Sequence, residues 1–465
     1  MFARCLRWRA AAVAAVSLTL AATQACTTTP GSPKAQNTTQ APNTPPSATK
    51  PRITPMTNIS AGCAGSSSEV EEASAPPGYV YAAWIGCSGI GFARSTDSGE
   101  HFDAAMTVPG SKGVSWDPAV TVAADGTIYA AFMHANGSPS SPSRYPVVAV
   151  SRDHGATFTR VHEDLPPAPG NWGDRVFIAA GKGNQLFLTW DYGPSATEVK
   201  LLCAKGGSCS FSNGDLNAVI QESGNGGATW GPMIHLQPGF PLGGGYGAPL
   251  VVDPGGSVDV LYVAHPTDQV TDKLHPGYEY FTSSKDGTRW PGAPQKLWPG
   301  KGTLSLPEWW IDGDISTDAA GNLYVTWDTQ TAAGDIGWLT YSENGGRTWS
   351  APFRVTPDTD NAPHIVESAA GQPGIAYVAW QTSAPAQGYA TYLRPFSIQR
   401  GWLAPAIKVS AAYGNAKIWP GDTFGISALP DGSISLTWGS AIGTHKRSAI
   451  YASVVKIWPS PAAST

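Results

Sequence analysis

Tyr81-Ala-Ala-Trp84, Tyr324-Val-Thr-Trp327 and Tyr377-Val-Ala-Trp380 are copies of one short segment that recurs seven times along this chain of 465 residues. The other copies begin at residues 129, 187, 262 and 435, so successive copies are 48 to 75 residues apart. An Asp-Gly or Gly-Asn turn precedes several of them, and alternating apolar segments come before those turns. This pattern predicts a strand, a tight turn and a second strand, repeated seven times.

A second repeat follows the first in most units. Ser95-Thr-Asp97-Ser-Gly99-Glu-His-Phe102 has the spacing of segments 151–158, 223–230 and 342–349, and segment 284–290 is one residue shorter. Asp and Asn bond to nearby backbone N–H groups, glycine adopts a positive φ, and a terminal aromatic ring packs a turn onto its sheet. We therefore expect five hairpin turns with a structural role.

This Ser-x-Asp-x-Gly-x-Thr-Trp pattern resembles the Asp box, or BNR repeat, of sialidases, and the resemblance covers about residues 56–458. It implies an all-β fold, a β-propeller of four-stranded blades with Asp boxes on the turns between third and fourth strands. Seven strand pairs favour seven blades, and six, the number in sialidase catalytic domains, is the alternative. We expect residues 53–60 to supply the outer strand of the seventh blade. Trp402 is expected at the aromatic position of the sixth, which lacks the box.

The composition excludes several classes of protein. Apolar residues make up 42% of the chain, which is enough for a large core, and 53 glycines with 40 prolines indicate many turns. The net charge of −5 leaves no basic excess to neutralise phosphates, so we expect no nucleic-acid partner. We expect a monomer that binds an extracellular carbohydrate or protein.

The first part of the sequence predicts export. Residues 1–25 combine arginines with an apolar stretch too short to span a bilayer, as in a signal peptide. Cys26 then stands where a bacterial lipoprotein carries its lipid, although the preceding residues depart from the usual pattern. We expect a lipid anchor to the cell membrane at Cys26, with secretion as the alternative. Residues 26–55, rich in Thr, Pro and Ser, are expected to form a disordered tether, and 459–465 a C-terminal tail.

The cysteines after residue 26 indicate an oxidising compartment. Their number is even, and Cys203 and Cys209 enclose a short loop that a disulfide could close. By elimination, Cys63 is expected to pair with Cys87. A zinc site is the competing interpretation, but the sequence has no Cys-x-x-Cys spacing or clustered histidines beside these residues.

Propeller topology predicts where a site would form. The turns of the two repeats should lie at one end, so the starts of the inner strands meet around the axis at the other. Acidic and aromatic side chains at those starts suit sugar recognition, because carboxylates accept hydroxyl hydrogen bonds and aromatic faces cover sugar rings. Each residue also has a structural interpretation, since Asp often caps loops and Trp often fills the space between blades. The candidate ligand-binding residues are Trp116, Asp117, Trp172, Arg175, Tyr246, Trp309, Asp314 and His364.

Two functions follow from these residues. The first is an extracellular propeller that binds glycan or protein without chemistry. The second is a sialidase-like exo-glycosidase, because carboxyl pairs supply the acid and base of glycoside hydrolysis. An envelope scaffold is a further alternative. The candidate catalytic residues are Asp174, Glu308, Asp312 and Asp422.

The resemblance to sialidases does not extend to their substrate clamp. Those enzymes hold a carboxylate with three arginines, whereas Arg175 alone lies at an inner-strand start here. Tyr246 and Glu308 could replace the nucleophile pair of sialidases only on grounds of topology. We expect no cofactor and no metal ligand among the candidates, although several aspartates near the axis leave Ca²⁺ open.

Overall fold

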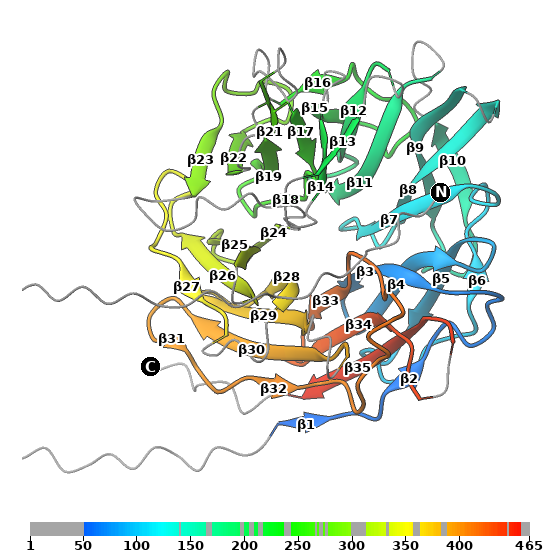
Figure 1. Ribbon diagram of the computed structural model, residues 1–465, viewed down its shortest axis with the longest axis vertical. Helices are drawn as coiled ribbons and strands as arrows, with labels where there is room; N and C mark the ends of the chain where they lie inside the picture. Colours follow the sequence, from blue (N-terminus) through cyan, green and yellow to red (C-terminus); the bar gives the residue numbers. More distant parts are fainter. Residues whose placement is uncertain are drawn as a thin grey trace, which may run out of the picture. The chain divides into compact units, whose positions relative to one another are not determined.

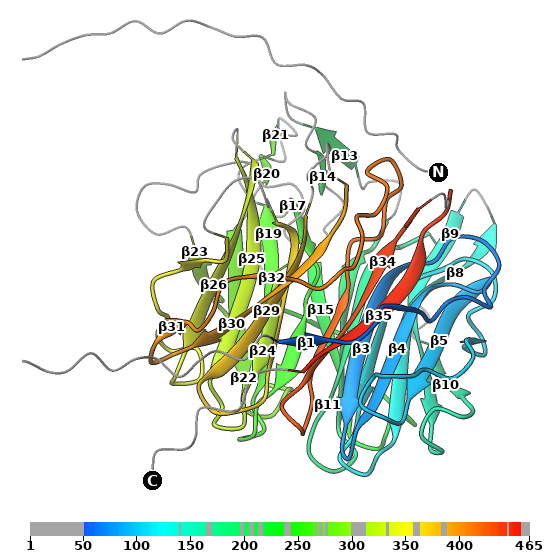
Figure 2. The same cartoon turned by 90° about the horizontal axis from the view of Figure 1, so that it is seen from below.

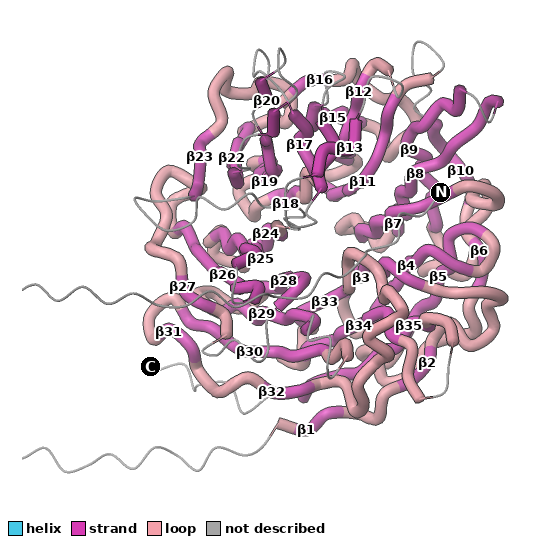
Figure 3. Tube along the Cα trace, viewed as in Figure 1, coloured by secondary structure: helices cyan, strands magenta, loops and turns pink. Residues whose placement is uncertain are grey.

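In the computed structural model, the described residues form an all-β structure (Figure 3). They are residues 51–138, 141–163, 170–195, 200–203, 209–212, 217–236, 243–265, 267–268, 273–274, 278–298, 313–331, 334–356, 363–382, 388–443 and 446–456. Nothing in these ranges forms a helix of the length and apolarity needed to cross a membrane.

Seven antiparallel sheets are arranged in a ring around a central axis (Figure 1). The first sheet contains β3 (Ser68–Ala75), β4 (Tyr79–Gly86), β5 (Gly89–Ser95) and β6 (Met106–Thr107). The second contains β7 (Ser115–Val122), β8 (Ile128–Ser138), β9 (Ser141–Ser151) and β10 (Thr159–Glu163). The third contains β11 (Trp172–Ala180), β12 (Leu186–Gly193), β15 (Asn217–Ser223) and β16 (Ile234–His235).

The next two sheets follow the same order from the axis outward. The fourth contains β17 (Gly243–Tyr246) and β18 (Leu250–Val252) innermost, then β19 (Val258–His265), β22 (Tyr278–Ser284) and β23 (Gln295–Trp298). The fifth contains β24 (Asp314–Thr317), β25 (Leu323–Thr331), β26 (Gly334–Ser342) and β27 (Phe353–Arg354).

The last two sheets and two hairpins complete the described fold. The sixth contains β28 (Pro363–Ala370), β29 (Ile375–Thr382), β30 (Thr391–Ser397), β31 (Gly401–Trp402) and β32 (Ile407–Lys408). The seventh contains β33 (Gly425–Ala428), β34 (Ile434–Ser440) and β35 (Ala449–Lys456), with β1 (Arg52–Ile53) and β2 (Thr57–Asn58) outermost. The separate hairpins are β13 (Lys200–Cys203) with β14 (Cys209–Ser212) and β20 (Thr267–Asp268) with β21 (Lys273–Leu274). The expected seven-bladed β-propeller is confirmed.

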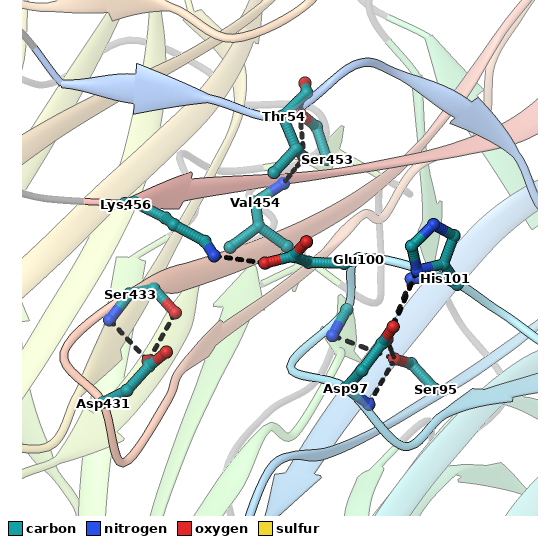
Figure 4. A network of polar contacts seen from close by, with 11 residues as sticks. Thr54, Ser95, Asp97, Glu100, His101, Asp431, Ser433, Ser453, Val454 and Lys456 are labelled. Atoms are coloured by element: carbon teal, nitrogen blue, oxygen red, sulfur yellow. Dashed lines mark hydrogen bonds and ion pairs between the residues drawn. The ribbon is translucent and has the colours of Figure 1, made fainter.

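The ring is closed by the first strands of the chain, as the sequence predicted. Strands β1 and β2 pair with β35, so the start of the described chain completes the last blade. Thr54 adds to this closure, since its Oγ1 accepts the backbone N–H of Val454 at 2.8 Å. Lys456 forms an ion pair with Glu100 of the first blade (Figure 4). These contacts join the seventh blade to the first.

The aromatic repeat forms the second strand of each blade. Its rings lie between neighbouring sheets, and Trp84, Trp327 and Trp438 are at most 2% exposed. Alternation along a strand places such rings on both faces of a sheet, so each blade packs against two neighbours. The spacing of the repeat therefore follows the spacing of the blades.

The four Ser-x-Asp/Asn-x-Gly segments and the shorter Ser284-Lys-Asp286-Gly287 segment, together called the Ser-x-Asp/Asn-x-Gly turns, are turns between third and fourth strands. In segment 151–158, Ser151 donates to Asp153 at 2.7 Å and accepts the N–H of Gly155 at 2.8 Å. The matching glycine donates to the matching serine in the other four turns, at distances of 2.9 to 3.0 Å. Gly346 has φ +77°, and a Cβ there would collide with the Phe281 ring of the preceding blade. The turns thus attach each of these blades to its neighbour.

The disulfide between Cys63 and Cys87 is confirmed. It joins the segment before β3 to the turn between β4 and β5, at the end of the propeller opposite the Ser-x-Asp/Asn-x-Gly turns. Cys203 and Cys209 lie directly opposite each other in the β13–β14 pair. Their side chains are outside the described part of the structure, so that disulfide remains a prediction.

Candidate functional site

The inner strands begin at one end of the propeller, here called the central face; the end that carries the Ser-x-Asp/Asn-x-Gly turns is called the turn face. Hairpins β13–β14 and β20–β21 project from the central face (Figure 2). The inner strands of the first three blades lie next to one another around the axis. Their side chains form the candidate site.

An irregular residue with positive φ occurs at the same place in three successive inner strands. These residues are Glu69 at φ 52°, Asp117 at φ 45° and Arg175 at φ 45°, each within a register shift of its strand pair. A left-handed conformation is uncommon for side chains other than Gly, Asn and Asp, and such strain gathers at functional sites. In the fourth blade Gly247 has φ 45°. The shift changes the direction of each side chain relative to the regular strand alternation.

The side chains at this level form a chain of carboxyl groups. Glu69 is hydrogen-bonded to Asp117, and Asp117 is hydrogen-bonded to Asp174. Asp174 Oδ1 also accepts the indole N–H of Trp116 at 2.6 Å. Two carboxyl groups in direct contact cannot both be ionised at low cost, so they hold protons between them. Each of the first three blades therefore contributes one acid to a group of carboxyl groups that hold protons.

Arg175 connects this chain to the seventh blade. Its guanidinium lies 3.3 Å from Asp422 Oδ2, and its backbone N–H donates to Asp117 Oδ2 at 3.0 Å. The Arg175 residue is 8% exposed, whereas the Asp422 side chain is 33% exposed. Glu69, Asp117, Asp174 and Asp422 are called the carboxyl cluster below. Asp422 is a member of this cluster that solvent can reach.

Burial and mutual repulsion raise the pKa values of the cluster. Burial, followed by the charge of Asp117, raises the pKa of Asp174 to about 7. Burial and the charge of Asp422 raise the pKa of Glu69 to about 7, and burial with the charge of Glu69 raises the pKa of Asp117 well above its usual range. Burial also raises the pKa of Asp422, but Arg175 opposes that shift. Four carboxyl groups with raised pKa values thus lie side by side in one site.

A cavity of about 160 Å³ occupies the centre of the ring, and each of the seven blades contributes to its lining. Arg175 belongs both to this lining and to the site above it. Asp314 lies in the lining and accepts the backbone N–H of Ser368 at 2.8 Å. Burial raises the pKa of Asp314 to about 6. This aspartate therefore links the inner strands of the fifth and sixth blades.

The same inter-blade contact recurs around the axis. Glu367 accepts the backbone N–H of Phe424 at 2.9 Å, and Asp191 accepts that of Gly247 at 3.2 Å. A carboxylate from one blade thus bonds to the inner strand of the next. The sequence predicted that Asp314 binds a ligand. The structure shows a different contact, in which its carboxylate holds the inner strand of the next blade.

The remaining predicted site residues divide into three groups. Trp172 lies at the start of β11, with the Arg144 guanidinium 4.4 Å from its ring centroid. Tyr246 and His364 lie in inner strands β17 and β28, and only their backbone is described. The predictions outside the described residues are Cys26, Glu308, Trp309 and Asp312.

Sequence reasoning missed Glu69, although a signal for it was present. Glu69 precedes Asp117 by 48 residues, the interval that separates Tyr81 from Tyr129 in the aromatic repeat. Aligning the inner strands on that repeat would have identified it. Asp191 was missed because it follows the buried Trp190 directly and looks like the end of a core strand.

The described residues contain no group of three or more His, Cys, Asp or Glu arranged to hold a metal ion. The acidic side chains of the cluster bond instead to one another, to Arg175 and to backbone N–H groups. Ca²⁺ binding has no supporting geometry in this part of the chain.

Comparisons with known proteins extend the description of the fold. No family model matches the chain, and no curated protein matches its sequence. A protein of unknown function from Dyadobacter fermentans is similar in structure, with 17% identity, 74% of this chain and 95% of that chain covered, and a TM-score of 0.50. An α-L-arabinanase from Penicillium chrysogenum has 14% identity, 88% and 98% coverage, and a TM-score of 0.49. The NanB sialidase from Streptococcus pneumoniae has 10% identity, 78% and 70% coverage, and a TM-score of 0.48.

These similarities concern the backbone. At such identities the function has to be argued from the side chains of this chain itself, above all from the carboxyl cluster.

Proposed function

We propose that the central face binds a glycan and that the carboxyl cluster hydrolyses a glycosidic bond. The observation that supports this is the hydrogen-bonded chain Glu69–Asp117–Asp174 beside the Arg175–Asp422 ion pair. Recognition alone does not require buried carboxyl groups in contact, which are costly to maintain. Acid–base catalysis does require carboxyl groups with different pKa values in one site.

The two kinds of carboxyl group suit different steps of hydrolysis. Asp174, whose pKa is raised to about 7, donates its proton to the glycosidic oxygen as the bond to the anomeric carbon breaks. Asp422, held beside Arg175, accepts a proton from the water whose oxygen attacks that carbon. Exchange with solvent then returns both groups to their starting states. Burial and Asp117 act on Asp174 and keep it protonated.

Binding without turnover is the second candidate function. It is favoured by the contacts that Asp174 and Asp117 already make with Trp116 and the Arg175 backbone. Each aspartate thus has one oxygen occupied by the protein, and a group fixed in this way can orient a sugar hydroxyl without donating a proton to it. The catalytic experiment below separates the two functions.

We also propose that the Ser-x-Asp/Asn-x-Gly turns are Asp boxes and that the protein is exported. The bond of serine to aspartate or asparagine, together with the glycine N–H to serine, supports the first assignment. The disulfide supports an oxidising compartment. The expected anchor is a lipid on Cys26. Fractionation of cells that express the wild type or Cys26→Ala tests it: loss of membrane association only in the variant supports the anchor, and equal distribution of both contradicts it.

The catalytic proposal is tested by release of fluorogenic sugars from a panel of neutral glycosides and sialosides. The enzymes are the wild type, Asp174→Asn, Asp422→Asn and the control Asp153→Asn on the turn face. Asn225 and Asn344 occupy the position of Asp153 in two other turns, so the control should fold normally. We expect turnover by the wild type and the control, and a loss of about 10²–10⁴-fold in each cluster variant. Absence of turnover with retained saccharide binding would favour the second candidate.

A further inference from the structure

Exposed large apolar side chains occur in segments that connect neighbouring blades. Among the described residues, Val114, Tyr413 and Trp419 are the large apolar side chains left exposed, at 64%, 38% and 44%. All three lie in segments that lead from the outer strand of one blade to the inner strand of the next. Two of them belong to the segment between β32 and β33, which rises on the side of β13 and β14 (Figure 2). Tyr413 and Trp419 are thus two exposed aromatic side chains in one segment, and aromatic faces are suited to packing on a ligand.

Trp419 is bonded to the carboxyl cluster. Its side chain forms a hydrogen bond with Asp422, which opposes the rise in the pKa of that aspartate caused by burial. Trp116 makes the matching contact with Asp174 on the other side of the site. The indole N–H of a tryptophan is its one polar group, so a ring held in this way keeps its faces for apolar contact.

The position of Trp419 is set by its neighbours before any ligand arrives. Its ring packs edge to face on Tyr389, with centroids 6.0 Å apart and planes at 82°. Gly414 exchanges two backbone hydrogen bonds with Tyr389, at 2.7 and 3.2 Å, and Asn415 donates to the carbonyl of Ala441 at 2.9 Å. The segment that carries Trp419 is thereby attached to both the sixth and the seventh blades. Preorganisation of this kind reduces the entropy lost on binding.

The charges of the site point to an uncharged ligand. Arg175 is paired with Asp422, and Lys408 lies over the Tyr413 ring, with Nζ 3.6 Å from its centroid. The acids of the carboxyl cluster add no positive charge, and any of them that ionises repels an anion. A sugar carboxylate needs converging guanidinium groups, whereas Arg175 is paired with Asp422 and the guanidinium of Arg144 lies over the Trp172 ring.

From these observations we infer that the face of Trp419 binds a second, uncharged sugar ring of the glycan, next to the ring that the carboxyl cluster holds. The CH face of a sugar packs on the indole, and Asp422 between the two rings accepts a hydroxyl hydrogen bond. The substrate is then a neutral saccharide of at least two rings. This inference rests on the proposed glycan binding and adds the class and length of the ligand.

The test measures saccharide binding by calorimetry in an Asp174→Asn background, which keeps an acceptor for Trp116 and is not expected to consume the ligand. The probes are glucose, xylose and arabinose with their disaccharides cellobiose, xylobiose and arabinobiose, together with lactose and 3′-sialyllactose. We expect Trp419→Ala to weaken disaccharide binding about five- to tenfold and to leave monosaccharide binding within about twofold. Trp419→Phe should retain most of the affinity, and the exposed aliphatic control Val114→Ala all of it.

The outcomes are distinguishable. Equal disaccharide affinity with and without Trp419 overturns the inference and leaves glycan binding intact, as does equal loss for monosaccharides and disaccharides. Tighter binding of 3′-sialyllactose than of lactose overturns the assignment of an uncharged ligand. If no probe binds even with Trp419 present, and the wild type binds none of them either, the proposed function fails and this inference with it.

Discussion

The two ends of this propeller carry acidic residues in opposite surroundings. On the turn face, Asp153 is exposed, and hydrogen bonds from Thr157 and Ser151 hold its pKa well below its usual range. On the central face, burial and neighbouring acids raise the pKa of Asp174 to about 7. The first arrangement stabilises an ionised carboxylate, and the second keeps a carboxyl group protonated.

The contrast shows how one residue type serves structure at one end and supports chemistry at the other. In the turns, Asn replaces Asp at residues 225 and 344 and keeps the bond from serine, so the charge itself is dispensable. In the carboxyl cluster the acids contact each other, and their ability to hold and release protons is the distinctive property.

The largest expected effect is on the pH dependence of hydrolysis. Asp174 acts as an acid only while protonated, so the rate should fall about tenfold per pH unit above about 7, or roughly 100-fold by pH 9. The measurement is kcat/KM from pH 5 to pH 9 on the best substrate of the panel. Asp153→Asn should leave the profile unchanged. A profile that stays flat to pH 9 would show that Asp174 is not the acid.

The buried acids around the axis should also govern stability against pH. Burial raises the pKa of Glu72 on β3 to about 7, so the folded state binds more protons than the unfolded state between about pH 4.5 and 7. Its contribution to stability is therefore present at low pH and is lost as the pH rises through about 7. We expect Glu72→Gln to stabilise the protein at pH 8 by roughly 1–3 kcal/mol and to have little effect at pH 4.5. Denaturant unfolding at both pH values measures this, and a stabilisation equal at both would exclude titration as its cause.

The turn face should respond in stability alone. Ser151 is 1% exposed and bonds to both Asp153 and Gly155, so Ser151→Ala leaves the buried N–H of Gly155 without this partner and also removes the bond to the exposed Asp153. We expect a loss of about 1–3 kcal/mol with unchanged kcat/KM for the folded fraction. Unfolding curves and activity per folded molecule check both parts. Lost activity in a fully folded variant would contradict the structural role of the turns.

The smallest expected effect lies at the closure of the ring. The Lys456 and Glu100 side chains are 36% and 33% exposed, so solvent screens much of their attraction (Figure 4). Lys456→Met should cost at most about 1 kcal/mol, because pairing of β1 and β2 with β35 closes the ring independently. A thermal melt compares the variant with the wild type. A much larger loss would mean that the ion pair, rather than the strand pairing, holds the seventh blade to the first.

Much of the fold was predictable because it repeats. The Tyr-x-x-Trp segments and the Ser-x-Asp/Asn-x-Gly turns recur in register. Each further copy of a repeat predicts the same local structure again, which strengthens the prediction. The closing strands were predicted because the seventh unit lacked an outer strand. The Cys63–Cys87 disulfide followed from counting the cysteines.

The site was predictable only in part. Asp117, Asp174, Arg175 and Asp422 were recognised as residues at inner-strand starts, and the structure brings them together. The contacts among them depend on shifts of strand register, which the sequence does not reveal. Trp419 was missed because it lies between strands, where no repeat aligns it with the other blades.

The central claim is that the carboxyl cluster holds protons near neutral pH, and its most direct test is an NMR titration of the protein labelled with ¹³C at the aspartate carboxyl carbons. We predict a resonance that titrates near pH 7 and disappears in Asp174→Asn, while the resonance assigned through Asp153→Asn titrates below the usual aspartate range. If the Asp174 resonance titrated near pH 4 like a solvated aspartate, the difference between the two faces, and the chemistry proposed from it, would be contradicted.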